Sequence, residues 1–211
     1  VLEKDIEKKK LLLLQYFNDI LLRDIFERYS IVATQQFKAL AQYIISNTGL
    51  KISPNKLAKE LGINPRSAEN YLSYLIDAYL IFEVPFFSYS AKTKYIAGRA
   101  SKYYTLDNGL TTVLSQRISE GHLFEALVAQ KLRKNNKEQL YYWADKTEVD
   151  FISDGKAINV VSSEEIPKRE YKGLIELKEK KKHIKEFILI TKEKVASSEF
   201  IHIPIEDFLK E

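Results

Sequence analysis

The middle third of the sequence holds basic and aromatic residues whose types and spacing suit contact with nucleic acid. Between Glu83 and Asp107 every charged residue is basic. The basic residues are Lys92, Lys94, Arg99 and Lys102, and they are interleaved with Tyr89, Tyr95, Tyr103 and Tyr104. Cationic side chains contact phosphates, and aromatic rings can stack on unpaired bases. This stretch therefore predicts a nucleic-acid contact surface.

A second candidate pair, Arg66 and Asn70, precedes this stretch. The two residues lie four positions apart, so a helix would place them on one face. Arginine and asparagine are residues that read the edges of bases. Glu69 and Asp77 belong to the same segment and make its charge slightly negative, which is unfavourable for a dedicated DNA reader. Two roles therefore stay open for this helix: contact with DNA, or docking on another protein.

Cap signals and apolar spacing predict the helices that position this pair. We expect one helix over Gln35–Asn47, a short one over Asn55–Leu61, and a third from Asn64-Pro65 to about Tyr79. The second and third each begin at a capping residue followed by proline, and a glycine ends the short one. A short helix, a glycine-containing turn and a longer helix form the order of a helix-turn-helix.

Strand signals follow the third helix. Leu80–Phe87 and Lys102–Asp107 are expected to pair as a hairpin around the basic loop. A helix-turn-helix followed by a hairpin is the order of a winged helix. Before it, Val1–Tyr29 is predicted to form one or two amphipathic helices, and after it residues 108–120 are predicted to be a connector.

Beyond Gly121 the pattern changes to alternating helices and strands. Helices are predicted at Leu123–Leu132, 168–184 and Ile205–Lys210, and strands at Leu140–Trp143, Glu148–Ile152, Ala157–Val161, Phe187–Thr191 and Phe200–Ile203. Asp154-Gly155 is a hairpin-turn signal between two of these strands. The expected fold is therefore α+β / α/β, a helical winged helix-turn-helix domain followed by a small α/β domain.

Composition excludes several classes of function. The 211 residues carry a formal charge of +4, and residues 31–120 hold ten basic against six acidic groups. The absence of cysteine excludes a disulfide framework, a thiolate metal site and a cysteine nucleophile. Since no apolar run approaches the ~18 residues of a membrane span and no signal-peptide layout is present, we expect a cytoplasmic protein without a membrane partner.

Several segments in this order resemble the C-terminal region of a group of prokaryotic AAA-type ATPases of uncharacterised function. The segments are Asn70–Ile81, Lys102–Leu110, Gly121–Val128, Tyr141-Tyr142-Trp143 and Glu148-Val149-Asp150-Phe151. Those proteins carry a nucleotide-binding core, then a winged helix, then a PD-(D/E)XK nuclease-like domain. The resemblance covers the chain from about residue 15 onward. It implies that the second domain here is nuclease-like.

The resemblance also implies a site for Mg²⁺-assisted phosphodiester hydrolysis, in which Glu125 and Asp150 match the acidic positions. Where the family places glutamate and lysine on the next strand, this chain has Asn159-Val160-Val161. Asparagine offers a neutral oxygen, and valine cannot act on a water molecule. We therefore expect no competent nuclease. The alternative reading of Glu125 and Asp150 is a polar pair at a vestigial pocket, bonded to Lys146 or to the backbone.

The resemblance sets the remaining expectations. Residues 1–30 would be a helical entry segment, 31–110 the winged helix and 121–211 the nuclease-like domain. The chain has no P-loop and lacks an initiator methionine, so an ATPase core that binds ATP is expected upstream. The leading hypothesis is DNA binding without cleavage. Two alternative functions stay open: a Mg²⁺-dependent nuclease, and a protein-interaction or lid module. Whether the chain forms a homo-oligomer also stays open.

Overall fold

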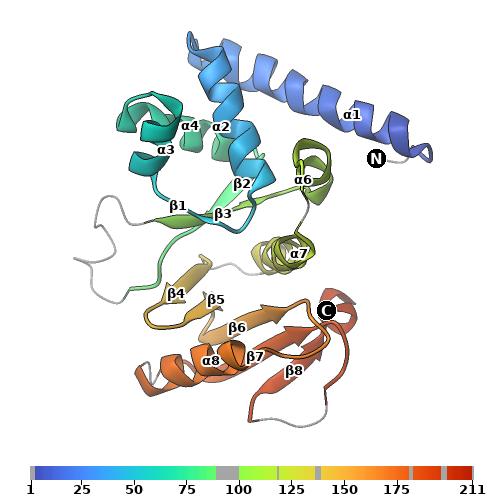
Figure 1. Cartoon of the computed structure of the whole chain (residues 1–211), viewed down its shortest axis with the longest axis vertical. Helices are drawn as coiled ribbons and strands as arrows, with labels where there is room; N and C mark the ends of the chain where they lie inside the picture. Colours follow the sequence, from blue (N-terminus) through green and yellow to red (C-terminus); the bar gives the residue numbers. More distant parts are fainter. Residues whose placement is uncertain are drawn as a thin grey trace. The chain divides into compact units, whose positions relative to one another are not determined.

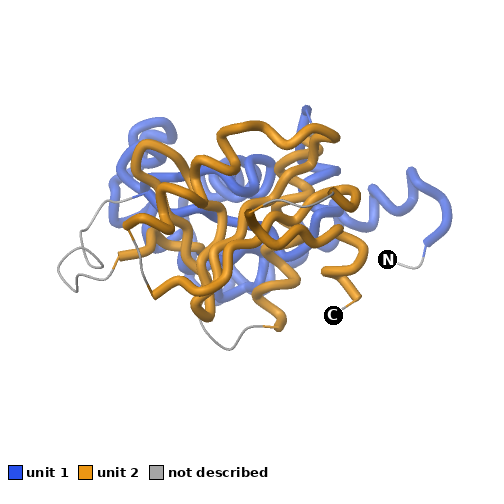
Figure 2. The backbone as a smooth tube through the Cα atoms, turned by 90° about the horizontal axis from the view of Figure 1, so that it is seen from below, with its two compact units in different colours: residues 1–83, 100–118 blue, residues 84–99, 119–211 orange. Residues whose placement is uncertain are grey.

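The computed structural model describes residues 3–88, 100–117, 119–135, 139–180, 183–195 and 199–210. The chain divides into two compact units, Val1–Glu83 with Ala100–Ile118 and Val84–Arg99 with Ser119–Glu211 (Figure 2). The first unit is mainly helical with a small sheet, and the second is built on a larger sheet (Figure 1). The predicted fold class, an α+β chain with a helical N-terminal part and a later sheet, is confirmed.

The first unit follows the predicted order of helices and then strands. Its elements are α1 (Ile6–Asp19), the π-helix η1 (Ile20–Glu27), α2 (Thr34–Ser46), β1 (Lys51–Ile52), α3 (Pro54–Leu61), α4 (Pro65–Asp77), β2 (Ile81–Val84), β3 (Ser101–Thr105) and α6 (Asn108–Leu114). The strands form a sheet in the order β1-β3-β2. Within the described residues, no helix is both long and apolar enough to span a bilayer.

The continuous helix of α1 and η1 packs one apolar stripe into the core of the first unit. Leu13, Phe17, Leu21 and Ile25 are all buried there, at a constant spacing of four residues. An α-helix with 3.6 residues per turn would rotate such a stripe steadily away from the core. The i→i+5 bonding of η1 widens the turn, which reverses this rotation. The π-helix therefore keeps all four side chains on the buried face.

Helices α3 and α4 begin where the cap signals predict, but the Ser53 side chain makes no capping hydrogen bond to α3. Gly62 takes the left-handed conformation at the end of α3, with φ +64°. The side chain of Asn64 then caps α4 by accepting a hydrogen bond of 2.8 Å from the Ser67 amide. The buried residues of α4 are Ala68, Tyr71, Leu72 and Leu75, so one face of this helix packs in the core.

Two predictions for the first unit need correction. Residues 108–120 are not only a connector, because Asn108–Leu114 forms the helix α6. Asp107 caps this helix by accepting a hydrogen bond from the Gly109 amide at 2.6 Å. The strand predicted over Leu80–Phe87 is also shorter, since β2 ends at Val84. The residues after it pair elsewhere.

Residues 85–87 run beside β4 (Tyr141–Ala144), within the second unit. The Tyr142 amide donates to the Pro85 carbonyl at 2.9 Å, and the Phe87 amide donates to the Tyr142 carbonyl at 2.6 Å. The Phe86 ring packs edge-on against Tyr142, with ring centroids 5.5 Å apart. This short segment therefore pairs with the outer edge of β4, which a lone edge strand would leave unpaired.

The second unit is organised around one mixed sheet. Its elements are α7 (Glu120–Asn135), β4, β5 (Glu148–Ser153), β6 (Lys156–Val161), α8 (Lys168–Lys180), β7 (Glu186–Thr191), β8 (Ile201–Pro204) and α9 (Ile205–Lys210). The strand order is β4-β5-β6-β7-β8 (Figure 1). Neighbours from β4 to β6 are antiparallel, and those from β6 to β8 are parallel. Asp154 and Gly155, at φ 50° and 73°, form the predicted hairpin turn.

Helix α8 covers one face of this sheet. Val149, Ala157 and Leu189 share a buried cluster with Leu174 and Leu177 of α8. Because strand side chains alternate between faces, Ile158 must face the opposite side, and it is buried as well. Helix α7 contacts β6. The sheet therefore has a packed layer on both faces.

Strand β5 contains a bulge at the position of the candidate aspartate. Tyr141 pairs with Ile152 and Trp143 pairs with Val149, so two steps along β4 face three steps along β5. Asp150 lies within this interval. A bulge inserts an extra residue and changes the direction of nearby side chains, and bulges are common beside functional sites.

Helix α8 approaches β5 closely because residue 173 is glycine. A Cβ atom built at Gly173 would lie only 2.3 Å from the carbonyl oxygen of Glu148. That oxygen belongs to the backbone of a strand and cannot swing aside. Glycine is therefore required at position 173 because any side chain would collide with β5. The backbone conformation there is one that other residues can also adopt.

We predict that Gly173→Ala destabilises the protein by about 1–3 kcal/mol, the usual cost of overpacking a core. The added methyl group would force α8 away from β5. Denaturant unfolding followed by circular dichroism measures the loss.

The matched control is Gly121→Ala, in α7. A Cβ at Gly121 meets the side-chain oxygen of Ser162 at 3.3 Å, which can rotate away. This variant should stay within about 0.5 kcal/mol of the native chain. Equal losses in both variants would contradict the close-approach argument.

Candidate functional site

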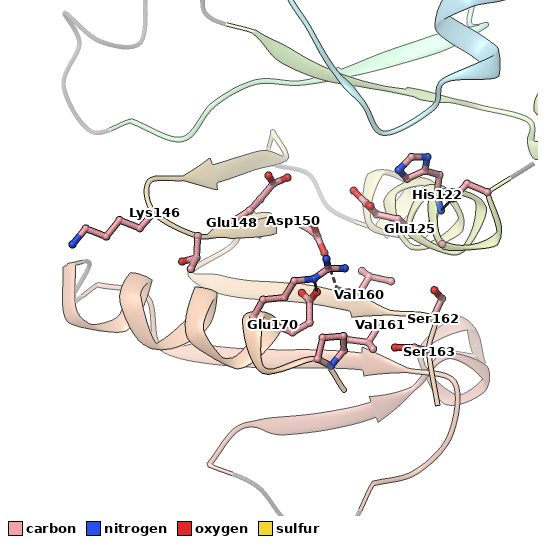
Figure 3. Close-up of a pocket in the computed structure, with 15 residues that line it drawn as sticks. His122, Glu125, Lys146, Glu148, Asp150, Val160, Val161, Ser162, Ser163 and Glu170 are labelled. Atoms are coloured by element: carbon pink, nitrogen blue, oxygen red, sulfur yellow. Dashed lines mark hydrogen bonds and ion pairs between the residues drawn. The ribbon is translucent and has the colours of Figure 1, made fainter. Parts of the chain in front are cut away.

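The second unit contains a pocket of about 550 Å³ between the start of α7, the β4–β5 hairpin, the end of β6 and the start of α8. Its lining includes the four carboxylates Glu125, Glu148, Asp150 and Glu170, together with His122, Lys146 and Arg169. Figure 3 shows the side chains of Glu125 and Asp150 reaching this space from α7 and β5. The structure therefore brings the two predicted acidic residues to one pocket.

Asn159, the third candidate, is fully buried and serves as a connector. Its side-chain oxygen accepts a hydrogen bond of 3.0 Å from the Asp150 amide. Its side-chain nitrogen donates to the carbonyl oxygen and to Oε2 of Glu170, both at 3.1 Å. One amide group thus joins β5, β6 and α8. A further bond joins the same strands, from the Val160 amide to the Asp150 side chain. We call these four hydrogen bonds the Asn159 clasp.

In the fourth bond of the clasp, a side chain of β5 accepts from the backbone of β6. The Asp150 Oδ2 atom accepts a hydrogen bond of 2.9 Å from the Val160 amide. The regular β5–β6 pairing begins only at Phe151, opposite Ile158. Beyond that point the side chains of Asp150 and Asn159 each bond to the backbone of the partner strand. The alternative reading of Asp150, a polar residue bonded to the backbone, therefore describes one of its contacts.

The pKa of the Glu170 carboxyl group is raised from its ordinary value. Burial raises this pKa, and the charges of Asp150 and Glu148 raise it further, while Arg169 acts in the opposite direction. The Arg169 Nε atom donates to Oε1 of Glu170 at 2.9 Å. Since Asn159 donates to Oε2, each oxygen of Glu170 accepts a hydrogen bond.

The residues of the pocket do not fit the Mg²⁺ site that the family resemblance implies. Mg²⁺ requires several oxygen ligands in near-octahedral geometry. The Asn159 oxygen faces the Asp150 amide, and Val161 is buried at 3% exposure in the cluster that faces α8. Across the described ranges, no group of three or more histidine or acidic side chains is arranged to hold a metal ion.

Sequence reasoning missed Glu170, which belongs to the clasp, Arg169, which bonds to Glu170, and Gly173, which lets α8 approach β5. All three lie on α8, for which the sequence predicts only a helix over residues 168–184. Their role depends on how closely α8 packs on β5, and a pattern along the chain carries no signal for that distance.

The candidate nucleic-acid residues have three different outcomes. Arg66 and Asn70 are exposed on α4, on the side away from the buried residues. Lys102 is only 4% exposed, because it lies in the central strand of the small sheet. Lys92, Lys94 and Arg99 lie outside the described residues. The structure also exposes Lys51, Lys56 and Lys59, on β1 and α3.

A family model described as a domain of unknown function, DUF8612, matches residues 1–120. The chain belongs to this family. A second model, the domain of unknown function DUF4143, matches residues 120–208 of this DUF8612 member. The boundary between the two matches lies where α7 begins.

The chain is also similar to an uncharacterised protein of Methanocaldococcus jannaschii, MJ1544, with 38% identity over 157 residues. This covers 70% of the DUF8612 chain and 35% of the relative, so the chain spans about a third of that protein's length. Among solved structures, a mutant of MepR from a multidrug-resistant S. aureus clinical isolate has a TM-score of 0.28 and 14% identity. The match covers 65% of this chain and 88% of MepR. A TM-score this low does not establish a common fold.

The β4–β5 hairpin beside the pocket is held to α8 by Glu176. Its carboxylate accepts hydrogen bonds from the Thr147 amide at 3.0 Å, from the Thr147 hydroxyl, and from the Lys180 ammonium at 2.6 Å. Lys180 also bonds to Asp145. The bonds from Lys180 and Thr147 lower the pKa of Glu176 to about 2.

We predict that Glu176 stabilises the protein at neutral pH and loses this effect in acid. A lowered pKa means that the folded form binds this proton less readily than the unfolded chain does. The contribution is therefore complete above pH 4.5 and disappears as the pH falls toward 2. Glu176→Gln should cost about 1 kcal/mol at pH 7.

Denaturant unfolding of the native chain and of Glu176→Gln, at pH 7, 4 and 3, checks this. The difference between the two should shrink as the pH falls. The control is Glu179→Gln on the exposed side of the same helix. A constant difference across this range would contradict the prediction.

Proposed function

We propose that the first unit binds duplex nucleic acid through the exposed face of α4, and that the second unit does not cleave it. The observation that carries the proposal is the division of α4 into two faces. One face packs in the core, and the other presents Arg66 and Asn70 one turn apart. These are residue types that donate to base edges in the major groove, which admits a helix of this size.

The charges around α4 are more favourable than its own composition. Lys56 and Lys59 on α3 are exposed cations, and Lys56 pairs with Glu60 at 3.9 Å, so α3 adds one net positive charge before the turn that leads into α4. On α4 itself, the Asp77 carboxylate accepts a hydrogen bond of 3.0 Å from the Tyr29 hydroxyl. This carboxylate therefore has a partner within the protein, at the end of the helix farthest from Arg66, whereas Glu69 is exposed next to Asn70. Phosphate contacts are expected at the α3 end.

A wider context is also proposed: the chain is the C-terminal region of an AAA-type ATPase. The DUF4143 match supports it, because this domain accompanies such ATPases, and the curated relative is about three times as long as the matched part. In this context the winged helix and a nuclease-like second unit would engage substrate, while nucleotide binding belongs to another part of the polypeptide.

Docking on a protein is the second candidate, and exposed leucines on the first helix favour it. Leu11 and Leu22 are 67% and 53% exposed, although their neighbours Leu13 and Leu21 are buried. Replacing both by lysine should weaken binding of the chain to the remainder of the full-length protein in a pull-down, and should leave nucleic-acid binding unchanged. Unchanged association would count against docking through this helix.

We expect Arg66→Ala to weaken duplex DNA binding about tenfold, the effect of losing one good base or phosphate contact. Gel retardation of a short duplex at ~50 mM salt, where phosphate contacts are strong, gives the affinity. Asn70→Ala should reduce discrimination between duplex sequences more than total affinity, because asparagine carries no charge.

Arg23→Ala is the matched control, since Arg23 is an exposed arginine of the same unit on η1. It removes the same charge away from α4 and should leave the affinity within about twofold. Absence of any retardation by the native chain would refute binding by the isolated chain. Equal weakening by both variants would indicate nonspecific attraction without a role for α4.

Mg²⁺-dependent cleavage is the competing function, and the Asn159 clasp argues against it. We expect no product from single- or double-stranded DNA incubated with the chain and either Mg²⁺ or Mn²⁺. A product that Asp150→Ala abolishes would reverse this conclusion and restore Glu125, Asp150 and Asn159 as a candidate site.

A further inference from the structure

We propose that the Asn159 clasp does the structural work that a bridging cation would do in this pocket, so that the second unit is assembled without metal and excludes it. The inference concerns the pocket alone and does not rest on nucleic-acid binding by α4. It follows from a disagreement: the fold resemblance implies Mg²⁺ here, and the side chains present do not fit that ion.

The first step is the direction of each hydrogen bond. A divalent cation holds carboxylates together by accepting electron pairs from their oxygens. In this pocket N–H donors fill that role: Asn159 donates to Glu170 Oε2, and Arg169 donates to Glu170 Oε1. The Val160 amide donates to Asp150 Oδ2. Both oxygens of Glu170 and one oxygen of Asp150 therefore already accept bonds from the chain.

The second step is burial. Asn159 is 0% exposed, and a buried polar group without a partner costs about 1–3 kcal/mol. An amide can use one acceptor and both donors at once, and Asn159 makes three such bonds. A carboxylate at this position would have no N–H to give to Glu170 and would place a third acid beside Asp150 and Glu170.

The third step is the charge balance. The Asn159 amide is neutral; it donates to the Glu170 carboxylate and accepts from the backbone amide of Asp150. The Arg169 guanidinium pairs with Glu170, and the charge of Asp150 also acts on it. One fixed positive charge and one neutral amide thus occupy the place of a divalent ion. Binding of a metal by the Glu170 carboxylate or by the Asn159 oxygen would require the clasp to open, which would unpair the Asp150 amide.

Thermal unfolding of the full chain in EDTA, and then with excess Mg²⁺ or Mn²⁺, tests the proposal. The unfolding midpoint of the native chain should not change on adding either ion. Asn159→Asp should unfold several degrees lower in EDTA and recover much of that loss when Mg²⁺ or Mn²⁺ is added, because the new carboxylate completes an oxygen-rich set with Asp150 and Glu170.

Asn135→Asp is the matched control, because Asn135 is exposed at the end of α7. This variant makes the same chemical change, and its unfolding midpoint should be the same in EDTA and with either metal ion. A native chain stabilised by either ion would overturn the proposal, as would an Asn159→Asp variant as stable as the native chain in EDTA. If Asn159→Asp unfolds under all conditions, the response of the native chain to the two ions decides alone.

Discussion

The distance between α8 and β5 governs the pocket of the second unit, and Gly173 sets that distance. Without a side chain at this position, the α8 backbone can lie against the carbonyl of Glu148. Glu170, one turn earlier on the same helix, then comes within 3.1 Å of the Asn159 amide. A wider gap would leave the side-chain nitrogen of the buried Asn159 without its two partners on α8. The close packing of α8 on β5 and the hydrogen bonding of Asn159 therefore depend on each other.

The same constraint explains why an acidic residue in a strand need not be catalytic. The bulge of β5 against β4 lies at Asp150, and the regular pairing of β5 with β6 begins only at the next residue, Phe151, so the Val160 amide of β6 has no ladder partner on β5. The Asp150 carboxylate supplies the missing acceptor to Val160. A carboxylate beside a bulge can serve chemistry or repair the sheet, and its partners distinguish the two. Here the partners of Asp150 and Asn159 belong to the backbone and to α8.

The sequence predicted the elements that short-range signals control. The caps at Asn64 and Gly62, the apolar face of α4 and the Asp154-Gly155 turn all form as expected, because each depends on residues within one or two turns. The helix α6 was missed, since glycine and two threonines weaken its local signal and contacts with α1 and α2 support it. The clasp could not be predicted from the sequence for a similar reason. Its residues come close together only when α8 packs on the sheet.

The burial of Lys102 changes what the nucleic-acid proposal requires. With this lysine inside the small sheet, the described cations near α4 are a few residues on α3, β1 and α4 itself. Because both the affinity and its salt dependence grow with the number of phosphates contacted, one copy of this unit should bind weakly, and its affinity should fall only gradually as salt rises. Tight binding would then need several copies acting on one duplex, since linked sites gain affinity from effective concentration without any new contact. An ATPase that presents the unit in a ring would supply such an arrangement, so the weak charge of α4 is compatible with the proposed context.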